Sequence, residues 1–289
     1  MPISCQTKYA TIPLSIKNNE IHLWQVNPNE ITSPELLNKY KNLLSDDETK
    51  KQQRYKFFQD RHDALITRAF VRNLLSYYAD VLPNDWHFER GEKDKPELVN
   101  PPLPLKFNIS HTKGLIICAV TLENDIGCDV ENTTRNNDVL AIADRYFSAI
   151  ETNELFSLPK DQQRHRFFDY WTLKESYIKA WGLGLAIPLK DFSFSIIDET
   201  PEVDDAVNKS TPFVIKNTIN IRFASHRIDN AERWRHWLLY PKGDDQHRIA
   251  IAIRAKDNNQ DVDYQLRFFN TIPLIGYKES EHKDLGYKD

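Results

Sequence analysis

Residues 170–185 read YWTLKESYIKAWGLGL, the pattern of a helix that ends in a glycine turn. Trp171, Glu175 and Ile178 recur at three- and four-residue spacing, so they share one stripe of that helix. The stripe predicts that Glu175 lies among buried apolar side chains, where a carboxylate needs a partner. Lys179, one turn later, could be that partner in an ordinary salt bridge. The question is what this carboxylate binds.

A second acidic pattern lies upstream, in the segment IGCDVE. As a strand, it would direct Asp129 and Glu131 to the same face. Neighbouring carboxylates resist full ionisation unless a cation lies between them, so D-x-E on an apolar strand is a candidate site for a hard divalent metal. For D-x-E alone, acids that face water are the more common explanation. Glu175 with its flanking Lys174 and Lys179 shifts the balance, because carboxylates beside lysines are typical of a magnesium and phosphate site.

The composition bounds the class of protein. The chain has 289 residues, 40% of them hydrophobic, which is enough for one large or two modest domains with a real core. A formal net charge of −4 argues against a nucleic-acid partner. The N-terminus lacks a basic segment followed by an apolar run, so we expect a soluble, unexported protein with no membrane partner. Cys5, Cys118 and Cys128 show no paired short spacing, which predicts reduced thiols in the cytoplasm.

The order of predicted elements indicates an α+β protein with two halves of similar build. Predicted helices between residues 33 and 80 precede two strand-like runs that begin at residue 106. Helices between 138 and 182 then precede four further strand-like runs, the last two forming a hairpin. The predicted parts are an N-terminal half at 1–125, a C-terminal half at 126–256, and a polar tail with one apolar segment at 257–289.

Together, the two acidic motifs resemble a known signature. IGCDVE at 126–131 and FDYWTLKESYIKAWGLGL at 168–185 are similar to the patterns G-x-D-x-E and W-x-x-K-E-(A/S)-x-x-K of the 4′-phosphopantetheinyl transferases, of the larger pseudo-dimeric type that activates surfactin synthetase. Both patterns fit without a gap, and a weaker resemblance extends over roughly 45–195. The family implies a pseudo-two-fold α+β fold with the active site between the halves. It also implies transfer of the 4′-phosphopantetheine arm of coenzyme A to a serine of an acyl or peptidyl carrier protein, releasing adenosine 3′,5′-bisphosphate.

The resemblance implies a set of residues around magnesium and the coenzyme diphosphate. The segment FNISHT is similar to the family's F-N-x-S-H-S/T, whose serine and histidine contact the diphosphate, although a histidine here could equally cap a turn. The implied magnesium ligands are Asp129, Glu131 and Glu175. The implied phosphate contacts are Ser110, His111, Lys174 and Lys179, and Glu175 and Lys179 are also implied to be catalytic.

Three more segments resemble coenzyme-binding or catalytic parts of the family. RGEKDKPEL is similar to the adenine-nucleotide loop R-x-x-x-G-K-P, with Asp94 in place of the usual glycine, and RYKFFQDRHDALITRAFVRNLL is similar to a basic helix that reaches the 3′-phosphate. RYFSAIETNEL is similar to a segment whose glutamate is proposed as the catalytic base. The implied residues are Arg90, Lys93, Lys95, Arg54 and Arg61, with Lys51 as a further candidate, and Glu151 as the base. For each of them a solvated surface position is the plain alternative.

Carrier proteins are generally acidic, so KDQQRHRFF at 160–168 is a candidate docking surface through Lys160, Arg164 and Arg166. We expect a monomer. One alternative is a non-catalytic coenzyme A or carrier-binding module of the same fold, against which the intact motifs argue. Another is a general magnesium-dependent nucleotide enzyme, but no G-x-x-x-x-G-K-[ST] loop is present. The sequence leaves open which carrier is served and whether acyl-coenzyme A is accepted.

Overall fold

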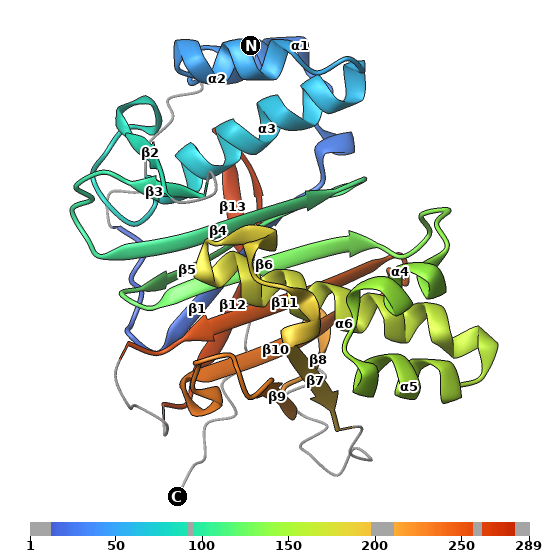
Figure 1. Ribbon diagram of the computed structural model, residues 1–289. Helices are drawn as coiled ribbons and strands as arrows, with labels where there is room; N and C mark the ends of the chain where they lie inside the picture. Colours follow the sequence, from blue (N-terminus) through green and yellow to red (C-terminus); the bar gives the residue numbers. More distant parts are fainter. Residues whose placement is uncertain (1–12, 92–94, 198–210, 257–261, 281–289) are drawn as a thin grey trace, which may run out of the picture.

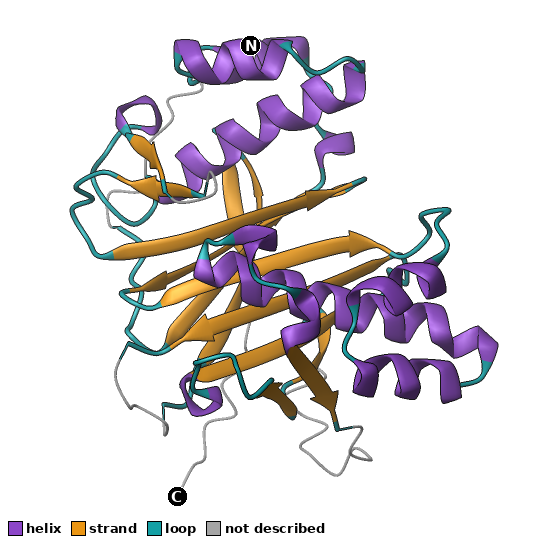
Figure 2. Ribbon diagram, viewed as in Figure 1, coloured by secondary structure: helices purple, strands orange, loops and turns teal. Residues whose placement is uncertain are grey.

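Two stacked sheets, each covered by one long helix, form the body of the protein (Figures 1 and 2). A computed structural model describes residues 13–91, 95–197, 211–256 and 262–280, and it confirms the predicted α+β class. The first sheet has the order β13 (Gly276–Glu279), β12 (Gln265–Ile272), β1 (Glu20–Val26), β5 (Leu115–Leu122), β4 (Leu105–Thr112). The second has the order β6 (Asp125–Asn132), β11 (His247–Arg254), β10 (Trp234–Pro241), β8 (Phe213–Lys216).

The helices and two small hairpin-like sheets surround this body. The helices are α1 (Pro34–Lys41), α2 (Asp46–Gln53), α3 (Phe58–Leu75), α4 (Val139–Tyr146), α5 (Ala149–Ser157) and α6 (Lys160–Trp181). The small sheets pair β2 (Phe88–Arg90) with β3 (Pro96–Leu98), and β7 (Phe192–Ile196) with β9 (Ile219–Phe223). Helices α1 and α2 each begin at a serine cap, because the hydroxyl of Ser33 accepts from Leu36 N and Ser45 makes a capping box with Glu48.

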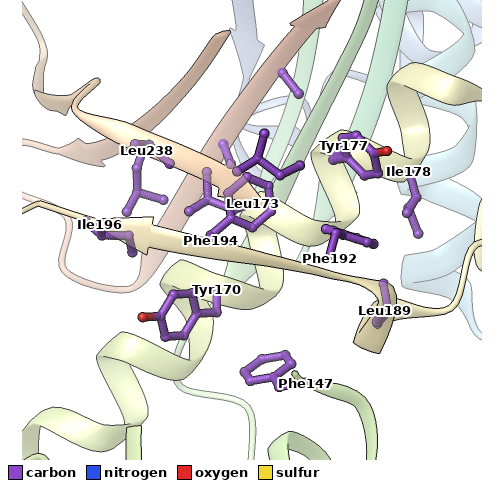
Figure 3. Packing of buried hydrophobic residues seen from close by; sticks show 14 of the residues in the cluster. Phe147, Tyr170, Leu173, Tyr177, Ile178, Leu189, Phe192, Phe194, Ile196 and Leu238 are labelled. Atoms are coloured by element: carbon purple, nitrogen blue, oxygen red, sulfur yellow. The ribbon is translucent and has the colours of Figure 1, made fainter. Parts of the chain in front are cut away.

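Three buried clusters hold the layers together. Helix α3 packs on the first sheet, where Phe70 meets the cluster that contains Trp24. Alternate strand residues such as Ile117 and Ile251 fill the space between the two sheets, as the two-residue period of a strand requires. Helix α6 covers the outer face of the second sheet and also packs against β7, as Leu173 in Figure 3 illustrates. The two halves therefore repeat one design, a sheet with a long helix on its outer face.

The C-terminal residues differ from the predicted tail. Strand β12 lies beside β1 in parallel register, with Leu23 opposite Phe268 and Trp24 opposite Phe269, and β13 continues the sheet. Phe268 and Phe269 are buried in the core. The apolar segment of the predicted tail is thus a strand of the first sheet, which places residues from both ends of the chain in the N-terminal half.

The edges of the two sheets meet along β4 and β6, joined by side chains of β4. The Asn108 amide oxygen accepts a hydrogen bond from Cys128 N at 2.9 Å, and the Ser110 hydroxyl accepts one from Val130 N at 3.3 Å. These bonds satisfy buried N–H groups on the edge of β6. On the other side of β6, α6 comes so close at Gly127 that an added Cβ would lie 2.0 Å from the Ser176 carbonyl oxygen. Strand β6 is therefore held between β4 and α6.

Candidate active site

Asp129 is the centre of a polar cluster between the two halves. It projects from β6 and is buried, with 3% of its surface exposed. Its Oδ1 accepts a hydrogen bond from the Ser110 hydroxyl of β4 at 2.9 Å and lies 2.5 Å from the Lys179 ammonium of α6. The same ammonium donates to Ser110 Oγ at 2.9 Å. One residue from each of three elements thus converges on a single carboxylate oxygen.

Two more carboxylates lie beside this contact. Glu131, two residues along β6, accepts a bond from Trp171 Nε1 at 3.2 Å and pairs with Arg135. Desolvation, then the charge of Asp129, raises the pKa of Glu175 to about 7, although Lys179 opposes the shift. Burial and the charge of Asp129 also raise the pKa of Glu131. The cluster therefore holds more negative charge than its own cations neutralise.

The cluster has the donor set that magnesium prefers. Asp129 Oδ2 is buried and has no hydrogen-bond partner among the described residues, which is costly unless something binds it. Carboxylate oxygens from Asp129, Glu131 and Glu175 suit a hard cation that takes a few carboxylates and completes its shell with phosphate. Over the described ranges, however, no three acidic, histidine or cysteine side chains already form a metal-binding group. The Lys179 ammonium pairs with Asp129 instead.

A cavity of about 420 Å³ lies in the first half, lined by residues of α2, α3 and β4. His111, next to Ser110 on β4, lines it, and desolvation together with Lys179 lowers the pKa of the imidazole. Lys51 and Arg54, both predicted from the sequence, line the same cavity from the end of α2. The structure thus brings one predicted diphosphate contact, His111, and two predicted 3′-phosphate contacts to one cavity.

Arg68 is a cavity residue that the sequence reasoning missed. It projects from α3 into the same space, and its charge contributes to lowering the pKa of His111. No described residue makes a hydrogen bond or an ion pair with the Arg68 guanidinium. Its sequence neighbours Ala64, Leu65 and Ala69 are apolar, so the sequence predicts no more than an ordinary helix face at Arg68. The only available sequence signal was a cation on the helix that the family uses for phosphate binding.

Other predicted coenzyme contacts lie outside this cavity or are already engaged. Arg61 donates from its guanidinium to the Tyr55 and Lys56 carbonyl oxygens, closing the turn between α2 and α3. Lys95 donates to the carbonyl oxygens of Ile126 at 3.2 Å and Ala180 at 3.0 Å, and burial lowers its pKa. In this structure both cations therefore hold the backbone.

Arg90 lies at the end of β2 in a neighbouring cavity of about 310 Å³, which Lys51 and Arg68 also line. This position agrees with an adenine-nucleotide side of the site. Lys93 and Asp94 of the predicted nucleotide loop lie outside the described residues.

Glu151 and Lys174 are the main corrections to the predicted site. Both are fully buried and form an ion pair with each other at 2.8 Å. Lys174 also donates to the Leu189 and Phe192 carbonyl oxygens at 2.7 Å, and Glu151 accepts from Phe194 N at 2.9 Å. The pair lies in the core between α5, α6 and β7 (Figure 3 shows the surrounding apolar residues). Neither side chain reaches substrate in this arrangement.

The predicted docking surface also changes. The Arg164 guanidinium donates to the Thr133 carbonyl oxygen at 2.7 Å and stacks on Phe168, while Arg166 pairs with Glu154 at 3.0 Å. Lys160 is the exposed member of the three. Two of the three cations are thus engaged in contacts within the C-terminal half.

Comparisons with known proteins identify the family of the chain. Residues 125–252 match the 4′-phosphopantetheinyl transferase superfamily, and residues 31–123 match the N-terminal 4′-phosphopantetheinyl transferase family. The chain is 35% identical over 176 residues to 4′-phosphopantetheinyl transferase HetI of Nostoc, covering 60% of this chain and 73% of the relative. It is 32% identical over 179 residues to 4′-phosphopantetheinyl transferase Sfp of Bacillus subtilis, covering 62% and 78%.

A more distant relative is L-aminoadipate-semialdehyde dehydrogenase-phosphopantetheinyl transferase of mouse, 28% identical over 224 residues, or 73% of this chain and 68% of the relative. The chain therefore belongs to the 4′-phosphopantetheinyl transferase superfamily. Its function is the transfer of phosphopantetheine to carrier proteins, as the motifs predict, and no match favours the non-catalytic alternative. Within the described ranges, no helix is both long and apolar enough to cross a bilayer.

Proposed function

We propose that the protein is a magnesium-dependent enzyme that transfers the 4′-phosphopantetheine arm of coenzyme A to the serine of an acyl or peptidyl carrier protein. The observation that carries this proposal is the buried Asp129, one of whose oxygens has no hydrogen-bond partner among the described residues, beside Glu131 and Glu175 whose pKa values are raised. Asp129, Glu131 and Glu175 would hold the ion. Magnesium bound there would supply charge compensation for the diphosphate.

The chain's own cations would do the remaining work on the diphosphate. His111 lines the cavity and Lys179 pairs with Asp129, so both can offset charge that develops on the leaving adenosine 3′,5′-bisphosphate. The Ser110 hydroxyl, bonded to both Asp129 and Lys179, orients the two side chains. Positioning and electrostatics dominate phosphoryl chemistry of this kind.

The nucleotide end of the coenzyme would occupy the two neighbouring cavities. Lys51, Arg54 and Arg68 provide positive charge for the 3′-phosphate, and Arg90 lies on the side where the adenine would bind. Arg61 and Lys95 would act through the backbone that they hold. Phosphate binding by cations on adjoining elements agrees with the electrostatic character of such sites.

We do not assign the catalytic base to Glu151, because its carboxylate is enclosed in the core. We further propose that the enzyme works in the cytoplasm, which the free, buried thiols of Cys118 and Cys128 support. A monomer would suffice, since one chain supplies residues to both sides of the site.

The direct test is incubation of the protein with coenzyme A, magnesium and a panel of apo carrier proteins, followed by intact mass measurement. A gain of one phosphopantetheine on any carrier, lost when magnesium is chelated and restored when it is returned, supports the proposal. Transfer that continues unchanged without divalent metal would contradict the magnesium assignment. The pattern across the panel identifies the carrier class.

A further inference from the structure

We propose that Lys179 is an internal competitor for the metal: its ammonium occupies Asp129 until the coenzyme diphosphate draws it away. The inference rests on the proposed function, since it assumes that Asp129, Glu131 and Glu175 bind magnesium. It adds an order to binding, because the site would accept the ion well only together with the coenzyme. It also gives Lys179 a second role besides contact with phosphate.

The first step of the argument is the geometry at Asp129. Oδ1 has two partners, the Lys179 ammonium at 2.5 Å and the Ser110 hydroxyl at 2.9 Å. The ammonium is fixed by a further bond to Ser110 Oγ at 2.9 Å. Lys179 therefore makes a specific contact that occupies Oδ1 of Asp129.

The second step is the charge around that contact. Two cations face three carboxylates: the charge of Lys179 acts on Asp129, Glu131 and Glu175, and Arg135 pairs with Glu131. The cluster remains under-neutralised, and Asp129 Oδ2 has no partner among the described residues. A second cation is therefore attracted to the cluster, but an ammonium already on Asp129 repels a divalent ion at short range. The two cations must compete.

The third step is that the Lys179 ammonium can move away from Asp129. Its side chain is 28% exposed, whereas that of Asp129 is 4% exposed. It interacts with His111, which lines the adjoining cavity, so an ammonium that withdraws from Asp129 has the cavity beside it. A diphosphate in that cavity would offer the ammonium a new anionic partner. Coenzyme and metal should then strengthen each other's binding.

The test is calorimetric titration of Mg²⁺ into the full chain without coenzyme. Lys179→Met removes the competitor, and we expect it to tighten Mg²⁺ binding by about tenfold relative to wild type. Arg68→Met removes a cation of the same site that is not bonded to Asp129, and we expect a change within about twofold because solvent screens it. Thermal unfolding of each variant checks that it is folded.

The same titration with saturating coenzyme A measures the coupling. Wild type should gain Mg²⁺ affinity on addition of the coenzyme by a larger factor than Lys179→Met, because only wild type has a lysine to release. Equal Mg²⁺ affinity of wild type and Lys179→Met without coenzyme, or the same tightening in Arg68→Met as in Lys179→Met, would overturn the inference. Asp129→Asn separates the two proposals: if it binds Mg²⁺ as wild type does, the metal site itself is wrong, whatever Lys179 does.

Discussion

Two lysines on α6 make ion pairs of opposite character. Lys174 and Glu151 are both 0% exposed, and nearby backbone groups complete their hydrogen bonds. Lys179 and Asp129 form a pair that is open on one side, with one oxygen left without a partner among the described residues and two further carboxylates nearby. The closed pair stabilises the fold, because no ligand can reach it. An open pair with excess charge of one sign is able to bind a ligand.

The largest effect on stability is expected from breaking the closed pair. Lys174→Met leaves Glu151 as an uncompensated buried charge, which should lower the free energy of unfolding by about 3–5 kcal/mol. Urea denaturation measures the change. Lys160→Met, on an exposed position of the same helix, is the matched control and should change little. Adding Glu151→Gln to Lys174→Met should recover part of the loss, and a double variant weaker than both single variants would contradict a paired role.

A slightly smaller effect is expected where α6 meets β6. In Gly127→Ala, the new methyl would lie 2.0 Å from the Ser176 carbonyl oxygen and 2.4 Å from Ala180 N. The helix must move, at a cost of about 3 kcal/mol. Because that movement carries Glu175 and Lys179 away from Asp129, transfer activity should fall even below the denaturation temperature. Gly243→Ala, whose added methyl has nothing within 4 Å, controls for loss of a glycine, and it carries its own φ strain at +75°. Wild-type activity in Gly127→Ala would show that the close contact does not position the open pair.

A substitution on the nucleotide side of the site should weaken coenzyme A binding and leave turnover unchanged. Arg68→Ala removes a cation of the cavity that pairs with no described residue, and it should raise the KM for coenzyme A by about tenfold, the scale of one charge-assisted contact. The kcat should change little, since Arg68 does not contact Asp129. Steady-state kinetics at several salt concentrations measures both constants. Arg222→Ala, on an exposed strand position, should leave KM unchanged. A loss confined to kcat would place Arg68 nearer to the reacting phosphate than the cavity suggests.

The open pair should also give the metal-free protein a pH-dependent stability. The folded state raises the pKa of Glu175 from 4.5 to about 7, so it binds this proton more tightly than the unfolded state. The free energy of unfolding should therefore fall as pH rises from about 4.5 to about 7. Glu175→Gln should flatten that fall in chemical denaturation, and saturating magnesium should oppose it. An identical slope in wild type and Glu175→Gln would show that another group titrates.

The sequence was informative where local periods decide the outcome. Asp129 and Glu131 share a strand face as their two-residue spacing predicts, and Gly182 ends α6 in the left-handed conformation, with φ of +73°. Lys174 was misplaced because the prediction used one buried stripe. Helix α6 has a second one, through Tyr170, Leu173 and Tyr177, and that stripe takes Lys174 into the core.

The remaining differences depend on contacts distant in sequence. The parallel pairing of β12 with β1 joins residues at opposite ends of the chain, and no local pattern specifies it. The same holds for Lys95, whose partners Ile126 and Ala180 come from two other elements. The family motifs point to the candidate site, but only the packing separates residues that face the cavity from those that hold it in place.

The most direct test of this account compares two glutamates, Glu151→Gln and Glu175→Gln, in the carrier transfer assay with unfolding measured in parallel. If the closed pair is structural and the open pair is the active site, Glu175→Gln should be as stable as wild type and inactive. Glu151→Gln should be less stable but active at temperatures where it is folded. A folded, inactive Glu151→Gln beside an active Glu175→Gln would contradict the account and return the catalytic role to Glu151.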